Sequence, residues 1–153
     1  MNSAVYASPI GALFIRSEEG HIVEVSFAST DLVSHENSNC EVIGKLAAEL
    51  DLYFAGELKK FSVPLKLNGT DFRKRCWEAL QTIPYGETIS YKQLAEKAGN
   101  PKACRAVGGA NHHNPVAIVV PCHRVIGADG SLTGFGGGLD KKKFLLDHEN
   151  RHK

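Results

Sequence analysis

Residues 121–126 read Pro-Cys-His-Arg-Val-Ile and follow the run Val-Ala-Ile-Val-Val at 116–120. That run is apolar and rich in β-branched residues, so it predicts a buried strand. Pro121 is expected to end the strand, because proline cannot donate a hydrogen bond to a ladder. The pattern therefore places the thiol of Cys122 and the imidazole of His123 where a rigid apolar element stops.

Cys122 has two interpretations at this point. The thiolate is the nucleophilic form of cysteine, and a neighbouring histidine is one way to generate it near neutral pH. Single cysteines are also common as inert, buried apolar side chains. The Cys-His spacing alone leaves both interpretations open.

The composition is typical of a globular protein with one ordinary domain or two small ones. The chain has 153 residues, of which 42% are hydrophobic and 23% charged. No apolar run approaches the length of a transmembrane helix. The first residues lack the basic segment and long apolar core of a signal peptide, so a cytoplasmic location is expected.

Charge is divided unevenly along the chain. Residues 1–68 hold 5 Lys and Arg against 9 Asp and Glu, whereas residues 69–153 hold 13 against 8. The second part could therefore face a polyanion such as a nucleic acid. A solvated lysine-rich helix face explains the same numbers, so the charge alone does not decide whether this part of the chain binds a nucleic acid.

The four cysteines form no C-x-x-C pair, so the sequence indicates neither a zinc site nor a thioredoxin-type redox centre. Cys76 and Cys104 fall on apolar helical faces and are expected in or near the core. Cys40 ends a polar stretch, residues 28–40, that is expected to be loop, and it receives no role.

The pattern of residues 1–68 predicts a small support domain. Three short strands separated by turn signals are expected, over residues 4–7, 13–16 and 22–27. Together they indicate an antiparallel meander. A helix is expected from Glu41 to a stop at Gly56, because apolar residues recur there at helical spacing. Residues 61–67 are expected to form a short strand or an extended link.

Residues 69–153 predict a mainly helical domain. One helix follows Thr70 and carries Trp77, which is expected to anchor the core. A last helix is expected to be capped by Asp140. The glycine-rich residues 134–138 form a loop, and they lack the strand–helix context of a phosphate-binding motif.

Two short helices are expected between these elements. The capping box S-x-x-Q at residues 90–93 opens the first, and Gly99 stops it. Asn and Pro at residues 100–101 are expected to start the second. The pair is typical of a helix-turn-helix, although an ordinary helical hairpin fits the same pattern. Lys102 and Arg105 on the second helix favour DNA binding.

Several short motifs occur in a recognisable order. They are I-P-Y-G-E-T at 83–88, S-Y at 90–91, A-V-G-G-A at 106–110, N-P at 114–115, P-C-H-R-V-I at 121–126 and H-E at 148–149. In this order they resemble the motifs of the O6-alkylguanine-DNA alkyltransferases, also called methylated-DNA–protein-cysteine methyltransferases. The resemblance covers the C-terminal half. It implies an α/β (α+β) fold, with a ribonuclease H-like domain over 1–68 and a winged-helix-like DNA-binding and alkyl-acceptor domain over 69–153.

The resemblance implies direct reversal of DNA alkylation, in which Cys122 accepts an alkyl group from guanine O6 in one irreversible step. O4-alkylthymine is a further candidate substrate. His123 would act as base through a water, Glu149 would orient it, and Asn114 would hydrogen-bond behind the cysteine. Direct contact between Cys122 and His123 is not expected, because residues i and i+1 of a helical turn do not face each other. No cofactor is needed.

The resemblance also implies that the target nucleotide is flipped out of the duplex, as chemistry on a base requires. Arg105 would replace the extruded base in the stack, and Tyr91 would crowd the target phosphate and help protonate the departing guanine. Lys102, Gly108 and Gly109 would complete the DNA contact, since small residues let another backbone approach. Taken alone, Arg105 is also an ordinary surface charge and Tyr91 an ordinary half-buried helix residue.

The implied substrate pocket departs from the family pattern in two places. Val125 would offer its backbone to the guanine amino group. Phe135 stands where a tyrosine is usual, and Gly136 where serine or alanine often follows. The adjacent histidines at 112–113 are a weak metal pair without further ligands, so no metal site is expected. The expected partner is duplex DNA that bears alkylated bases, the expected state is a monomer, and no membrane association is expected.

Two other functions remain open. A non-catalytic lesion-binding protein would need the helix-turn-helix alone, and the presence of Cys122 argues against it. A cysteine hydrolase would need an oxyanion hole and repeated turnover, and it would leave the helix-turn-helix without a purpose.

Overall fold

The computed structural model describes residues 2–27, 40–132, 135 and 138–153. The chain divides into two compact units: Met1–Leu67 with Pro115–Val119, and Asn68–Asn114 with Val120–Lys153. The sequence pattern predicts one boundary near residue 68, and it gives no sign that residues 115–119 belong with the first unit.

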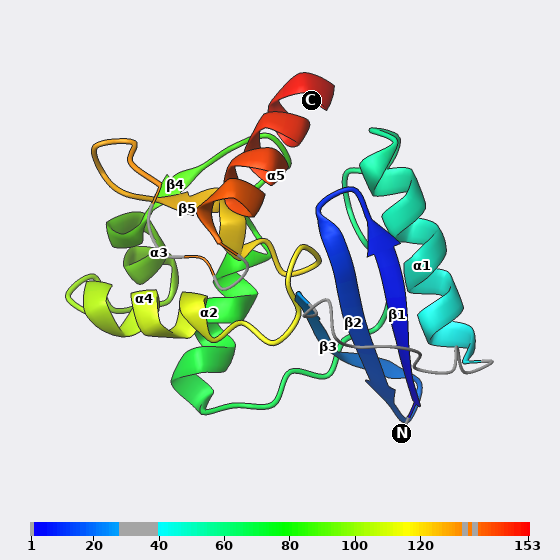
Figure 1. The fold of residues 1–153 in the computed structure, drawn as a ribbon. Coiled ribbons are helices and arrows are strands. Elements are labelled where there is room, and N and C mark those ends of the chain that lie inside the picture. The colour runs from blue at the N-terminus through cyan, green and yellow to red at the C-terminus, as the bar shows by residue number, and fades with distance from the viewer. Residues whose placement is uncertain (1, 28–39, 133–134, 136–137) are drawn as a thin grey trace. The chain divides into compact units, whose positions relative to one another are not determined.

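The first unit is a three-stranded sheet covered by one helix (Figure 1). Its elements are β1 (Asn2–Ser8), β2 (Gly11–Glu18), β3 (His21–Phe27) and α1 (Glu41–Phe54). The strands pair antiparallel in the order β1-β2-β3, which confirms the predicted meander. The α1 helix packs on all three strands and ends as predicted, because Gly56 adopts a φ of 79° and donates to the carbonyl of Tyr53.

Residues 116–120 are largely buried, but they do not form the predicted strand. Only the first of them pairs, in an isolated parallel bridge with Val25 of β3. Ile118 has a φ of 71°, and the N–H of Val119 bonds to the carbonyl of Ala117 at 2.8 Å. This is a γ-turn of the rare, strained kind. A β-branched residue seldom adopts positive φ, so the apolar run could not reveal the turn.

The second unit is mainly helical. Its elements are α2 (Asp71–Leu80), β4 (Ile89–Ser90), α3 (Tyr91–Lys97), α4 (Cys104–His112), a 3₁₀ turn (Cys122–Arg124), β5 (Val125–Ile126) and α5 (Leu139–His152). Helices α2, α3 and α4 pack on one another, and α5 packs on the 3₁₀ turn (Figure 1). Trp77 is buried as predicted, and its Nε1 donates to the carbonyl of Ala110 at 2.9 Å, which ties α2 to α4. The short parallel pair β4–β5 was not predicted.

The first helix of the helix-turn-helix region begins and ends at the predicted signals. The hydroxyl of Ser90 accepts from the N–H of Gln93, and the Gln93 side chain accepts from the N–H of Ser90. This confirms the capping box. Gly99 follows the helix with a φ of 89°, as a helix stop requires.

The second helix begins later than predicted. The side-chain oxygen of Asn100 accepts from the N–H of Lys102 at 3.2 Å, so this stretch forms a turn, and α4 starts after Ala103. Asparagine offers the backbone such a local alternative to a helix. Lys102 therefore lies before the helix, whereas Arg105 lies on it. Cys104 is exposed in the first turn, and the prediction that it lies in or near the core is wrong.

The last helix also begins differently from the prediction. Gly138 is the N-cap residue, and Asp140 lies inside the first turn, where no side-chain cap forms. An acidic residue there still interacts favourably with the positive end of the helix dipole. Most of the predicted glycine loop, including Gly136, lies outside the described residues.

Candidate active site

Cys122 begins the 3₁₀ turn and is 6% exposed. Pro121 before it has φ −81° and ψ 65°, and the N–H of Cys122 bonds to the carbonyl of Val120 at 2.8 Å. These values describe an inverse γ-turn. The thiol therefore lies in a tight turn that follows a proline, and not at the end of a strand.

The thiol of Cys122 is surrounded by groups with opposing effects. Burial raises its pKa, while a hydrogen bond from the Asn114 side chain and the charge of Lys142 act in the opposite direction. The Asn114 amide also donates to the carbonyl of Val120 at 2.8 Å, which fixes its position. Because burial dominates, the resting side chain is a thiol and needs a base to become a nucleophile.

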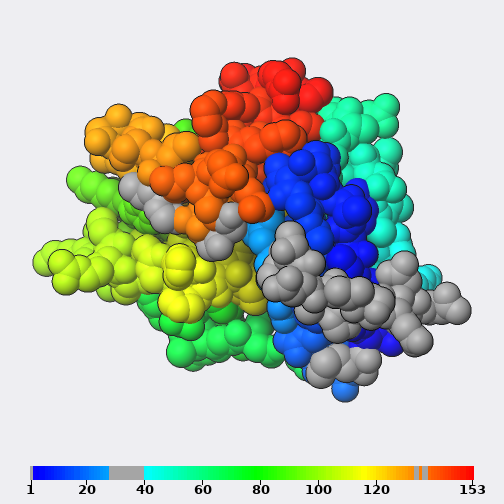
Figure 2. All heavy atoms as spheres, viewed as in Figure 1, coloured from blue at the N-terminus to red at the C-terminus, as the bar shows by residue number. Residues whose placement is uncertain are grey.

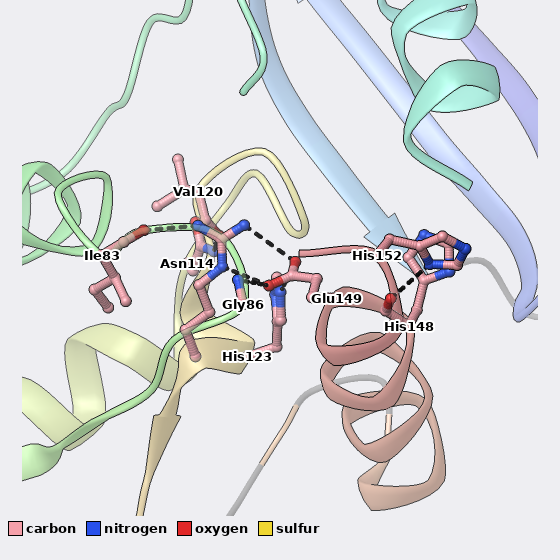
Figure 3. Close-up of polar contacts among 9 residues, drawn as sticks. Ile83, Gly86, Asn114, Val120, His123, His148, Glu149 and His152 are labelled. Atoms are coloured by element: carbon pink, nitrogen blue, oxygen red, sulfur yellow. Dashed lines mark hydrogen bonds and ion pairs between the residues drawn. The ribbon is translucent and has the colours of Figure 1, made fainter. Parts of the chain in front are cut away.

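His123 and Glu149 form a buried pair. His123 Nε2 lies 2.7 Å from Glu149 Oε2, and the two side chains are 0% and 1% exposed. Figure 3 shows the carboxylate of Glu149, on the last helix, directed toward His123. His123 Nδ1 is buried and has no hydrogen-bond partner among the described residues.

This geometry sets the protonation of the imidazole. A carboxylate can only accept, so the shared proton lies on Nε2 and leaves Nδ1 as the acceptor. Burial lowers the pKa of His123, and the charge and hydrogen bond of Glu149 oppose that shift. His123 is therefore a neutral imidazole with one nitrogen available to take up a proton.

Arg124 is a site residue that the sequence interpretation missed. Its Nε donates to Glu149 Oε1 at 2.7 Å, its Nη2 to Oε2 at 3.1 Å, and its Nη1 to the carbonyl of Ile83 at 2.7 Å. Burial opposes ionisation of Glu149, but the charges and hydrogen bonds of His123 and Arg124 hold the pKa of this carboxyl well below its usual range. The carboxylate is therefore ionised although it is buried.

Lys142 is the second missed residue. It is fully buried on α5, and its Nζ donates to the carbonyl of Val125 at 2.6 Å. Burial lowers its pKa, and the interaction with Cys122 opposes this. A signal was present in the sequence, because positions 142 and 149 share a helix face at i and i+7. Val125 was expected to offer its backbone to the guanine amino group. Its carbonyl already accepts one hydrogen bond from Lys142, and a carbonyl can accept two.

The predicted DNA-binding residues lie on and before α3 and α4. Arg105 and Lys102 are exposed, and the surface of this region is visible in Figure 2. Tyr91 begins α3, and its ring lies 3.9 Å from the position that a Cβ at Gly108 would occupy. A Cβ at Gly109 would meet nothing within 4 Å. Of the predicted residues, Asn114 contacts Cys122 and Glu149 contacts His123, whereas Arg105 and Lys102 lie at the surface.

The structure shows fewer contacts for the remaining predicted site residues. Phe135 is half-buried. His112 and His113 are exposed, with ring centroids 5.3 Å apart, and His113 Nδ1 lies 2.8 Å from the carbonyl of Gly109. Over the described ranges, no three His, Cys, Asp or Glu side chains gather as metal ligands would. No helix in that part of the chain has the length and apolar character needed to cross a membrane.

Two family models match the chain. The ribonuclease-like domain of 6-O-methylguanine DNA methyltransferase matches residues 1–67, and the DNA binding domain of the same family matches residues 71–151. The chain belongs to this family. The resemblance drawn from the short motifs is thereby confirmed.

Individual relatives agree with this assignment. A methylated-DNA–protein-cysteine methyltransferase of Methanosarcina acetivorans is 48% identical over 153 residues, which cover 97% of this chain and 98% of the relative. One from Mycolicibacterium paratuberculosis is 64% identical over 104 residues, which cover 68% of this chain and 63% of the relative. A crystal structure of Mycobacterium tuberculosis OGT in complex with DNA has a TM-score of 0.90 and 45% identity over 99% of this chain and 94% of that one. The mixed α/β fold is thus confirmed, and the winged-helix likeness stays a prediction.

Proposed function

We propose that this chain repairs DNA by direct reversal of alkylation, moving an alkyl group from guanine O6 to the sulfur of Cys122. The observation that carries the proposal is the buried thiol of Cys122, held by Asn114 in the same unit as a neutral His123 paired with an ionised Glu149. Nucleophile, base and orienting carboxylate are the three roles that such a displacement needs. Membership of the methyltransferase family supports the same chemistry.

The transfer forms one S–C bond and breaks one C–O bond. The proton of Cys122 passes through a water to Nδ1 of His123, and Glu149 stabilises the resulting imidazolium. The thiolate attacks the alkyl carbon in line, and the C–O electron pair stays on the guanine, which takes up a proton from Tyr91. Tyr91 regains a proton from solvent, to which the imidazolium of His123 releases the proton of the thiol. A thioether is a poor leaving group, so each chain acts once. The step uses no cofactor.

The DNA contact is assigned to residues 69–153, and residues 1–68 act as support. Arg105, exposed on α4, fills the space of the flipped nucleotide, and Lys102 contacts a phosphate. The open space at Gly109 and the glycine at 108 let the DNA backbone approach α4 closely. We assign α4 to the minor groove, as the family resemblance implies. This suits a repair protein, because the hydrogen-bonding pattern in that groove depends little on sequence.

The partner is duplex DNA with O6-alkylguanine, with O4-alkylthymine as a second candidate. The protein acts as a monomer in the cytoplasm. The proposed chemistry requires one acceptor thiol per lesion and no second subunit, which supports the monomer.

Mass spectrometry tests the acceptor. The chain is incubated with duplex DNA that holds one O6-methylguanine, digested, and searched for a methyl group. We expect one methyl per chain on Cys122, none in Cys122→Ser, and normal transfer in the matched control Cys104→Ser, whose thiol is exposed. A methyl on Cys40, Cys76 or Cys104 would overturn the assignment.

The same preparation separates the two rival functions. Binding of methylated duplex without any transfer would favour a lesion-binding protein. Repeated turnover of an activated ester would favour a hydrolase.

Arg105→Ala tests the role in flipping. The variant should repair duplex DNA much more slowly than the wild type, and it should react with free O6-benzylguanine at the wild-type rate, because the free base needs no extrusion. Equal slowing of both reactions would show that Arg105 supports the fold or the pocket instead.

A further inference from the structure

Each of the three guanidinium nitrogens of Arg124 is engaged inside the second unit. Nε and Nη2 donate to the two oxygens of Glu149, and Nη1 donates to the carbonyl of Ile83. The guanidinium carbon also lies 5.6 Å from the centroid of the Tyr85 ring. With only 8% of its side chain exposed, Arg124 is held in one position.

The carboxylate that Arg124 holds is the one that His123 contacts. Glu149 Oε2 accepts from His123 Nε2 at 2.7 Å and from Arg124 Nη2 at 3.1 Å. A carboxylate with a single partner can rotate about its last bond, whereas a planar guanidinium that grips both oxygens fixes its plane. The N–H of Gly86 also donates to Oε1, but at 3.4 Å and to that oxygen alone. The direction in which Glu149 presents Oε2 to His123 therefore depends chiefly on Arg124, which makes the shorter contacts with both oxygens.

We propose that Arg124 is a positioning residue for alkyl transfer, which holds Glu149 so that His123 keeps its proton on Nε2 and leaves Nδ1 free to accept one. The inference rests on the proposed function, since the tautomer of His123 matters only if this residue takes the proton of Cys122.

Charged groups surround His123 and Glu149, so the role of Arg124 can be tested by measuring the transfer rate as a function of pH. His123 is close to Arg124 of its own turn and to Glu149 and Lys142 of α5, and Glu149 also interacts with Tyr85 of the loop before β4. Arg124 is a cation, so it disfavours a second cation on His123. Without it, His123 becomes protonated at a higher pH and loses its role as base there. A lysine keeps the cation but lacks the two-nitrogen grip.

Two variants separate charge from geometry. The rate of reaction with free O6-benzylguanine is measured against pH in the full chain, and circular dichroism gives the folded fraction. In Arg124→Met, the rate at optimal pH should fall about 10- to 100-fold, and the pH below which activity is lost should rise. In Arg124→Lys, the rate should fall while that pH stays near the wild-type value. Arg75→Met, at an exposed arginine of α2, is the matched control and should change neither.

Nitrogen NMR of His123 supplies a second measurement, which does not depend on the transfer. We expect the wild type to carry the proton on Nε2 and Arg124→Lys to show both tautomers. This comparison decides the matter if Arg124→Met does not fold. The proposal is overturned if the folded variants keep the wild-type tautomer and the wild-type pH profile.

The proposed function and the role of Arg124 fail in different ways. A wild-type chain that forms no adduct on Cys122 overturns the proposed function. A wild-type chain that reacts normally, beside Arg124 variants that react equally well, overturns only the role of Arg124.

Discussion

Glu149→Gln is the most stringent test of the proposed proton transfer from Cys122 to His123. The amide keeps the shape of the carboxylate but offers one acceptor and one donor. Its oxygen can face either Arg124 Nε, or both His123 Nε2 and Arg124 Nη2, which lie 2.7 Å and 3.1 Å from Glu149 Oε2. In the second orientation His123 keeps its tautomer but loses the negative charge that stabilises its protonated form. In the first orientation the NH₂ faces His123 Nε2, and because two donors cannot bond to each other, His123 is driven to the tautomer that carries its proton on Nδ1. In that form it can no longer take the proton of Cys122.

Two magnitudes follow from this geometry. Loss of a positioned base should slow the transfer by roughly 10²- to 10⁴-fold. Loss of the carboxylate charge leaves Arg124 buried without a counter-charge, a defect that costs about 3–5 kcal/mol of unfolding free energy. The hydrogen bond retained by the amide oxygen places the cost near the lower end, at about 3 kcal/mol. For a chain of 153 residues, such a loss lowers the melting temperature by roughly 6–12 °C.

The assay combines two measurements. Transfer is followed in a single turnover, with protein in excess over labelled methylated duplex, and melting is followed by circular dichroism. Asp147→Asn is the matched control, because Asp147 is an exposed carboxylate of the same helix that pairs with Lys143, and it should behave as wild type. In the double variant Glu149→Gln/Arg124→Met, the unpaired charge is gone, so the melting temperature should recover while the transfer stays lost.

Two results would refute this reasoning. A folded Glu149→Gln chain that transfers within about tenfold of the wild-type rate would show that His123 does not depend on the carboxylate. A single variant that melts at the wild-type temperature would show that Arg124 finds another partner or reaches solvent.

Three further predictions concern charge and packing. In Lys142→Met, the pKa of the Cys122 thiol should rise further, because a nearby cation is lost, and the pH dependence of iodoacetamide alkylation should show it. Unfolding should take up protons at His123 below about pH 6.5 and at Glu149 below about pH 4.3, since the folded pKa of each group is lowered. The melting temperature should therefore fall as the pH falls, and a flat profile would contradict this. Trp77→Phe leaves a buried carbonyl of α4 without its donor, so the denaturation midpoint should drop by an amount equivalent to about 1–3 kcal/mol.

The elements that the sequence predicted well depend on near neighbours in the chain. Thr70 caps α2 by accepting from the N–H of Arg73 at 3.2 Å, and Ser90 caps α3 through Gln93. Each signal spans three residues, so the chemistry that decides the helix start is visible in the sequence itself. The meander was predictable for the same reason, because alternation and turn residues are local.

Two incorrect predictions have different physical causes. Residues 116–120 look like a strand, yet one isolated bridge to Val25 is their only pairing in the described chain. Burial, and not a ladder, explains their apolar character. At Asn100 the competing interaction was local, since the side chain bonds two residues ahead, but both outcomes were compatible with the same Asn-Pro pair.

The sequence interpretation paired Glu149 with His123, and the structure shows that contact, but it did not predict what else Glu149 binds. The motifs named Cys122, His123 and Glu149, but the bond that holds Glu149 to Arg124 spans 25 residues of sequence. Nothing in the spacing of a histidine, an arginine and a distant glutamate says which pairs will meet. Lys142 was within reach of sequence reasoning, because the face of α5 that carries Glu149 also carries it.

The burial of Cys122 has a physical purpose if each chain transfers only one alkyl group, as proposed. If the thiol accepts an alkyl group irreversibly, any side reaction of that thiol inactivates the chain. A resting thiolate would react with oxidants and with electrophiles other than the substrate, and the chain would be lost. Burial raises the pKa of Cys122 and prevents this loss, but the same burial would leave the thiol inert. Asn114 and Lys142 reduce the penalty without removing it. In the proposed mechanism, His123 supplies the base only in the tautomer that Glu149 favours and Arg124 helps to hold. The reactivity of Cys122 is therefore set by the arrangement of its neighbours, which explains why the Cys-His pair alone could not decide between an inert and a reactive cysteine.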